Sequence, residues 1–172
     1  PVFWASGACL LIRKNIYQQF GGLDEDFFAH MEEIDLCWKI NRAGLEVYYC
    51  GQSTVYHVGA GTLGYGSPGK TYLNFRNGLS LLWKHLSTGE LCYKFPVRLL
   101  LDWLAALVFL LQRKPALTWA VLKAHLHFFK NIRQQHTKRK TLGATYPFYN
   151  GRFMLRRLLV YDYYVRGQRL AN

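Results

Sequence analysis

The stretch DFFAHMEEIDLCWK, residues 26–39, is the most informative part of this 172-residue chain. Three carboxylates, Glu32, Glu33 and Asp35, begin a segment whose apolar residues recur near helical spacing, and Gly44 marks its expected end. A helix N-terminus tolerates such acids because its dipole favours negative charge. The cluster is therefore either an ordinary group of acidic residues at a helix N-terminus or the acidic edge of an active site.

Two features around this helix refine the second interpretation. Glu33 and Asp35 stand two residues apart and cannot share one helix face, so we expect one to point at a substrate and the other to brace the structure. His57 separates an alternating segment from the glycine-rich stretch 59–69, a position where site residues gather. It is either a metal ligand or an ordinary structural histidine. The glycine-rich stretch contains neither GK[ST] nor GxGxxG.

The remaining periodicity predicts alternating helices and strands in the first half and helices in the second. Strands are expected over residues 9–12, 46–50 and 53–58, and helices over 13–20, 32–43 and 70–85. Residues 99–111 and 115–129 form two apolar helices, the first roughly 20 Å long and too short to cross a hydrocarbon core of about 30 Å. A basic run at 138–140 and a mixed basic and apolar segment at 152–165 follow.

Charge divides the chain into two unlike halves. Residues 1–90 hold seven basic and eight acidic side chains, whereas residues 91–172 hold fifteen basic and two acidic ones. Such a basic half is expected to meet nucleic acid or an anionic membrane, or to be the exterior of a helical bundle. The two apolar helices favour the anionic membrane surface and argue against nucleic acid, which has no use for them.

The cysteines and the first residues bear on the compartment. Cys9, Cys37, Cys50 and Cys92 form no CxxC pair, which is typical of a reduced cytosolic setting. Pro1–Trp4 shows no signal peptide. The missing initiator methionine and the immediate apolar segment indicate that the chain begins inside a longer protein.

The first 85 residues resemble the C-terminal portion of bacterial family 2 glycosyltransferases, especially the rhamnosyltransferase-like members that build surface polysaccharides. The resemblance lies in the order and spacing of several short sequence segments. Its segments are Ser6-Gly7-Ala8-Cys9, Gly21 to Phe28, Glu32-Glu33-Ile34-Asp35-Leu36 with Lys39 where arginine is usual, His57 to Ala60, and Arg76-Asn77.

This resemblance implies an α/β fold: the C-terminal, acceptor-side part of a GT-A (Rossmann-like) catalytic domain over residues 1–88, followed by a helical membrane-associating region over 89–172. It also implies inverting transfer from a nucleotide-sugar donor to a saccharide or lipid-linked acceptor, at the cytoplasmic face of the inner membrane. The chain lacks the Asp-x-Asp element of such enzymes in its usual place, so alone it is expected to be inactive.

The resemblance also implies roles for particular residues. Glu33 is expected to be the general base, with Glu32 and Asp35 completing the catalytic cluster. His57 is expected to help hold a divalent metal, Mn²⁺ or Mg²⁺, whose other ligands lie outside this chain. Residues expected to contact substrate are Trp4, Ser6, Gly7, Lys70, Arg76 and Asn77. The rival hypothesis is a non-catalytic basic module that docks on membrane or nucleic acid.

Overall fold

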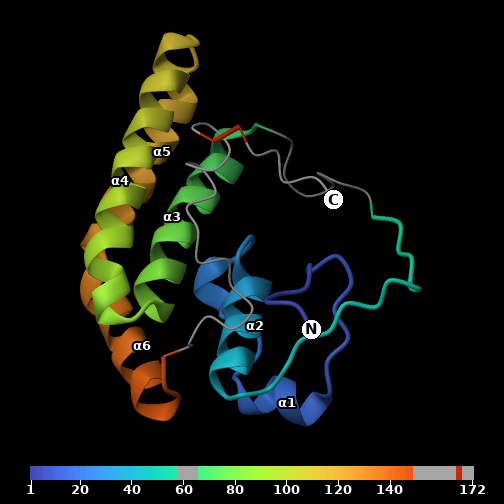
Figure 1. Ribbon diagram of the computed structural model, residues 1–172. Helices are drawn as coiled ribbons and strands as arrows, with labels where there is room; N and C mark the ends of the chain where they lie inside the picture. The colour runs from blue at the N-terminus through green and yellow to red at the C-terminus, as the bar shows by residue number, and fades with distance from the viewer. Residues whose placement is uncertain (58–65, 149–165, 168–172) are drawn as a thin grey trace.

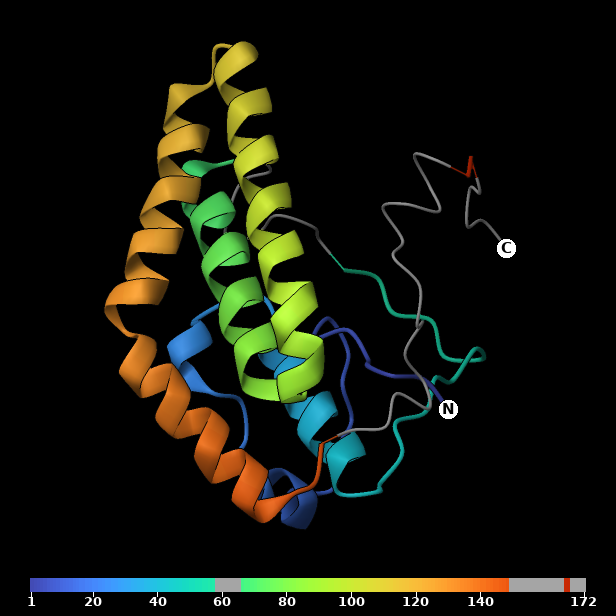
Figure 2. The ribbon, with the colours of Figure 1, turned by 60° about the vertical axis from the view of Figure 1, so that its left-hand side comes forward.

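The computed structural model describes residues 1–57, 66–148 and 166–167. Its helices are α1 (Lys14–Gln19), the 3-10 helix η1 (Glu25–Phe27), α2 (Glu32–Arg42), α3 (Pro68–His85), α4 (Thr88–Leu111), α5 (Pro115–Lys130) and α6 (Ile132–Thr145). Helices α4 and α5 form a long antiparallel hairpin, and α2 lies beside the C-terminal end of α3 (Figures 1 and 2). Helix α3 packs against α4, α5 and α6, so it is the centre of the arrangement.

The predicted α/β fold is wrong for the described residues. They contain no strand, and their only bridge pairs Val2 with Val47, where the Val2 amide donates to the Val47 carbonyl at 2.8 Å. The segments 9–12, 46–50 and 53–57 therefore lack the ladders that the sequence predicted. An alternating pattern marks one buried face of an extended segment, but a strand also needs a neighbour for its backbone groups. Leu10 and Ile12 pack instead against a core of helical residues.

The predicted helices over 13–20, 32–43 and 70–85 are confirmed as α1, α2 and α3, because their end signals are local. Gly21 and Gly22 take φ angles of 71° and 64° after α1, and Gly44 takes 78° after α2. Ser67 caps α3, accepting the Lys70 amide at 3.3 Å, and Pro68 occupies its first turn.

The first apolar helix is longer than residues 99–111. Helix α4 starts at Thr88 because Ser87 and Glu90 form a capping box, in which each side chain bonds the other's backbone amide. The second apolar helix is confirmed as α5, and the basic run 138–140 lies in α6. The segment 152–165 lies outside the described residues, and the boundary at 88/89 stays a prediction.

Helix α2 is fixed by two hydrophobic clusters on different faces. Leu36, Cys37 and Ile40 join Phe20 and Val47 in the first cluster. Trp38 joins Phe27, Leu81 and Leu86 in the second, which links α2 to the end of α3. A third cluster of Leu79, Phe95 and Phe128 holds α3, α4 and α5 together. Of the helices that the structure describes, none combines the length and apolarity needed to cross a bilayer.

Candidate functional site

The loop that leads into α2 has a strained backbone. Phe28, His30 and Met31 take φ angles of 61°, 68° and 78°, a region that residues other than glycine rarely adopt. Asn77 of α3 holds this loop, because its Nδ2 lies 2.9, 2.8 and 2.7 Å from the carbonyl oxygens of Phe27, Ala29 and His30. Asn77 is almost completely buried, so these contacts fix the loop where α2 begins.

Arg76 supports the same loop from the neighbouring position. Its Nη2 donates to the carbonyl oxygens of Asp26 at 2.7 Å and Phe27 at 3.0 Å, and its Nε donates to Asn77 Oδ1 at 2.8 Å. Arg76 and Asn77 therefore position the loop through its backbone. Their predicted contact with substrate stays a prediction.

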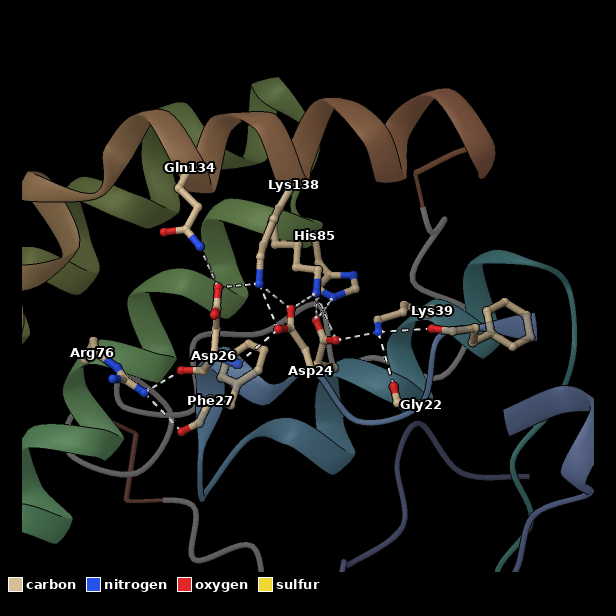
Figure 3. A network of polar contacts seen from close by, with 12 residues as sticks. Gly22, Asp24, Asp26, Phe27, Lys39, Arg76, His85, Gln134 and Lys138 are labelled. Atoms are coloured by element: carbon tan, nitrogen blue, oxygen red, sulfur yellow. Dashed lines mark hydrogen bonds and ion pairs between the residues drawn. The ribbon is translucent and has the colours of Figure 1, made fainter. Parts of the chain in front are cut away.

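Asp35 lies at the centre of a buried ionic network, of which Figure 3 labels Lys39 and His85. Its carboxylate is 2.9 Å from Lys39 Nζ, 2.8 Å from Lys84 Nζ and 2.8 Å from His85 Nε2. Lys39 also donates to the Phe20 carbonyl at 3.3 Å, and His85 stacks on Trp38 with centroids 4.6 Å apart. The network ties α2 to α3 through Asp35, and the predicted catalytic role of Asp35 stays a prediction.

Burial and charge shift the pKa values of this network in a consistent way. Burial opposes ionisation of Asp35, but the hydrogen bond from His85 and the charges of Lys84 and Lys39 outweigh it and hold the Asp35 pKa far below its ordinary range. Burial lowers the pKa of His85 to about 4, against the raising influence of Asp35. At neutral pH His85 is therefore an uncharged donor to an ionised Asp35.

Helix α6 reaches the same region from far along the chain. Lys138 Nζ lies 2.7 Å from Asp24 Oδ1 and also pairs with Asp26, while Gln134 donates to Asp26 at 2.9 Å (Figure 3). Lys84 joins the two parts of the network, because its Nζ lies 2.9 Å from Asp24 Oδ2. A polar cavity of about 260 Å³ borders these ion pairs. The loop before α2 is thus held by both α3 and α6.

Glu32, Glu33 and His30 bring three buried, unpartnered atoms together at one place; the other such atoms among the described residues are scattered over Trp38, Asn41, Arg42, Trp83 and His85. Oε2 of Glu32, Oε2 of Glu33 and Nε2 of His30 make no hydrogen bond to the described residues, although solvent does not reach them. Buried polar atoms are normally paired, and an exception calls for a functional or ligand-based explanation. All three stand at the N-terminus of α2, where the dipole favours an anionic side chain.

The segment that holds Ser6 and Gly7, both expected to contact substrate, lies beside Glu33. A methyl group placed on Gly7 would lie 3.7 Å from Cβ, Cγ and Cδ of Glu33. The segment is held there because Asn41 donates to the Phe3 carbonyl at 2.9 Å and the Phe3 ring packs edge-on against Trp38. Trp4 and Ser6 on the same segment are exposed, as a substrate contact requires.

The divalent metal expected at His57 stays a prediction, since its other ligands are expected outside this chain. No group of three or more His, Cys, Asp or Glu side chains in residues 1–57, 66–148 and 166–167 is arranged to hold a metal ion. His57 is an exposed side chain, and residues 58–60 of its motif lie outside the described residues. Alone, His57 offers one imidazole and not a metal centre.

Lys70, expected to contact substrate, stands in the first turn of α3, at the opposite end from Lys84 and His85.

Sequence reasoning missed the residues that brace the site. Asp24, Lys84, His85 and Lys138 come from three separate segments, and their pairings span 49 to 114 residues. Asp24 lay within the quoted Gly21–Phe28 motif, but no spacing connects it to a lysine in a later helix. His125 of α5 is likewise buried, and its Nε2 lies 3.0 Å from Asp102 Oδ2 of α4.

Comparison with known proteins gives partial matches. The chain is 43% identical over 58 residues to an N-acetylglucosaminyl-diphospho-decaprenol L-rhamnosyltransferase of Mycobacterium tuberculosis, a match that covers 33% of this chain and 19% of that protein. Part of this chain is related to glycosyltransferases. No protein-family profile matches the chain, and no solved structure does.

Two further glycosyltransferases support this relation. A low-salt glycan biosynthesis hexosyltransferase of Haloferax volcanii is 31% identical over 78 residues, which is 45% of this chain and 25% of that protein. A rhamnosyltransferase of Escherichia coli is 33% identical over 48 residues, which is 28% of this chain and 18% of that protein. The matched regions therefore span a quarter or less of these curated relatives.

Proposed function

We propose that this chain is part of an inverting family 2 glycosyltransferase and that Glu33 is its general base. The single observation that carries the proposal is the buried, unpartnered Oε2 of Glu33 beside the Ser6–Gly7 turn. A carboxylate oxygen that none of the described residues engages keeps its lone pairs for a ligand hydroxyl. The braced position of α2 supports the same role, because a base must be held in register with the proton that it removes.

The proposed reaction uses Glu33 in one step. An acceptor hydroxyl oxygen attacks the anomeric carbon of a nucleotide sugar, and the bond from that carbon to the diphosphate oxygen breaks, so the nucleoside diphosphate leaves with the electron pair. Glu33 takes the hydroxyl proton as the new carbon–oxygen bond forms. Attack opposite the leaving group inverts the anomeric centre. Asp35 is the positioning residue, since its buried network holds α2 and does not reach the reacting atoms.

The relatives suggest the substrate class. The mycobacterial and E. coli proteins are rhamnosyltransferases by name, and the former name specifies a diphospho-decaprenol-linked sugar. We infer for the protein that contains this chain a nucleotide-sugar donor and a saccharide or lipid-linked acceptor in surface-polysaccharide biosynthesis. A divalent metal held partly by His57 remains a prediction, and no step above depends on it.

The deciding experiment compares two acids in the full-length protein. Glu33→Gln keeps the shape of the side chain and removes the base, so kcat should fall by about 100-fold or more while the Kd for the donor stays unchanged. Glu25→Gln, at an exposed acid of η1, is the matched control and should keep normal turnover. Near-normal turnover of Glu33→Gln would reject the catalytic role, and absence of any sugar transfer by the wild type would support the non-catalytic module instead.

A further inference from the structure

The outer side of α4 is apolar over most of its length. Val97, Leu100, Leu104, Leu107 and Leu111 are all exposed and recur every three or four residues, so they form one stripe. Trp103 is also exposed and widens the stripe; these six residues are the α4 face. From Cys92 to Leu111, no exposed position of α4 carries a charge.

The charged side chains of α4 are partly or fully buried and pair with opposite charges, Lys94 with Glu90 and Arg98 with Asp102. Arg98 Nε lies 2.6 Å from Asp102 Oδ1, and His125 Nε2 of α5 lies 3.0 Å from Asp102 Oδ2. Asp102 is 3% exposed, so the one acid in the apolar part of the helix does not reach the α4 face. The polar residues that prevent α4 from being a membrane span therefore do not prevent its outer side from contacting lipid.

Exposed basic side chains lie at one end of this apolar surface and on α5, where Lys123 Nζ is 5.3 Å from the centroid of the Tyr72 ring of α3. Arg113 and Lys114 lie at the turn between α4 and α5, where Figures 1 and 2 show the free end of the hairpin. Lys123 and Lys130 are exposed on α5, beside the exposed Trp119. Apolar and tryptophan side chains bordered by lysine and arginine are the combination that binds the interface of an anionic bilayer.

The width of the α4 face favours a bilayer over a second copy of the chain as the surface that it contacts. A coiled-coil seam is a narrow stripe whose flanking positions carry charges that set the pairing. Here the positions flanking the stripe include Trp103, Val108 and Leu110, all apolar and exposed. A helix that is apolar around its whole exposed side fits lipid, and the basic rim fits anionic headgroups.

We propose that the α4 face docks on an anionic lipid bilayer, with α4 along the interface and not across it. The stripe spans α4 from Val97 to Leu111, so one helix presents the contact. This narrows the expected membrane association of residues 89–172 to one side of one helix, and peripheral location at the inner membrane stays a prediction. The proposal is independent of catalysis, because lipid binding needs neither donor nor acceptor.

Vesicle co-sedimentation of the full chain tests this proposal. Mixed phosphatidylglycerol and phosphatidylcholine vesicles should bind the wild type, and rising salt should weaken the binding without abolishing it, because the apolar contact is not screened. Arg113→Gln with Lys114→Gln should reduce partitioning about 25-fold, since each basic residue near an anionic leaflet contributes about a fivefold effect.

A pair of charge-matched double variants locates the contact. Leu104→Glu with Leu107→Glu should lower binding by at least about tenfold, because two carboxylates would enter the lipid contact. Leu11→Glu with Val55→Glu adds the same charge at exposed sites outside the hairpin and should lower it much less. Circular dichroism checks that both variants fold.

Three results would overturn the proposal: equal loss in the two double variants, equal binding to pure phosphatidylcholine vesicles, or no binding to any vesicle. Concentration-dependent dimers that only the α4 variant disrupts, without vesicle binding, would assign the face to a second copy. None of these results bears on the role of Glu33, because that role is measured by turnover.

Discussion

Lys138 Nζ lies 2.7 Å from Asp24 Oδ1, although 114 residues separate the two in the chain. Asp24 begins the η1 loop and Lys138 belongs to α6, so the last described helix contacts the loop that leads to the candidate base. The same aspartate also pairs with Lys84 of α3. The geometry at the start of α2 therefore depends on helices from both halves of the chain.

Loss of the Asp35 charge should destabilise the protein strongly. Asp35→Asn leaves the ammonium groups of Lys39 and Lys84 buried without their shared carboxylate, and removal of one partner from a buried ion pair costs about 3–5 kcal/mol. Urea denaturation followed by circular dichroism measures the free energy of unfolding. Glu25→Gln, an exposed acid, should change it by less than about 0.5 kcal/mol. Similar values for the two variants would contradict a bracing role for Asp35.

Acidification should destabilise the protein between pH 6.5 and 4. His85 has a pKa of about 4 when folded and 6.5 as its ordinary value, so in this window the unfolded chain binds a proton that the folded chain does not. The contribution is fully present above pH 6.5 and is lost as the pH falls toward 4. Its full size is on the order of 3 kcal/mol.

The pH effect can be assigned to His85 by substitution. His85→Gln keeps an amide that can donate to Asp35 but cannot titrate, so most of the pH dependence in this window should disappear. A smaller slope should remain from His127, because burial and nearby basic side chains also lower the pKa of that imidazole. The depressed pKa of Asp35 acts at lower pH, where its contribution is lost below its ordinary value of 3.8. An unchanged slope in His85→Gln would show that another group is responsible.

Asn77→Asp should release the loop that precedes α2. The substitution keeps the size of the side chain and replaces the donating amide with an oxygen that faces three carbonyl oxygens, so attraction becomes repulsion. Amide hydrogen exchange of residues 26–34 should become faster, and the protein should lose at least about 2 kcal/mol. Asn74→Asp, on the same helix, controls for the added charge. Equal exchange in both variants would refute the positioning role of Asn77.

Lys138 should act on local order more than on global stability. Its side chain is partly exposed, so Lys138→Gln is expected to cost only about 1 kcal/mol. Hydrogen exchange in the Asp24–Phe28 segment should nevertheless increase, since α6 no longer holds Asp24 and Asp26. Lys140→Gln removes the same charge from an exposed neighbour and should leave that exchange unchanged. Identical exchange in the two variants would contradict the link between α6 and the loop.

Local signals account for what the sequence predicted correctly. The ends of α1, α2 and α3 depend on adjacent glycines or on Ser67 and Pro68, and the acids at the start of α2 are adjacent in sequence. The predicted strands do not form among the described residues because a strand must pair its backbone with a segment distant in sequence. Alternation at residues 9–12 or 46–50 does not show whether such a segment lies alongside. The Asp24, Lys84, Asp35 and Lys138 network was missed for the same reason, since only the packing of α2 against α3 and α6 brings these charges together.

The link between α6 and the η1 loop also has a consequence for biosynthesis. A ribosome adds about 5–20 residues per second, so the 114 residues between Asp24 and Lys138 take on the order of ten seconds to synthesise. During that interval Asp24 and Asp26 have left the ribosome without the lysine that pairs with both. The start of α2 therefore reaches its final geometry only after translation has passed α6, well after the residues of α2 itself have been made.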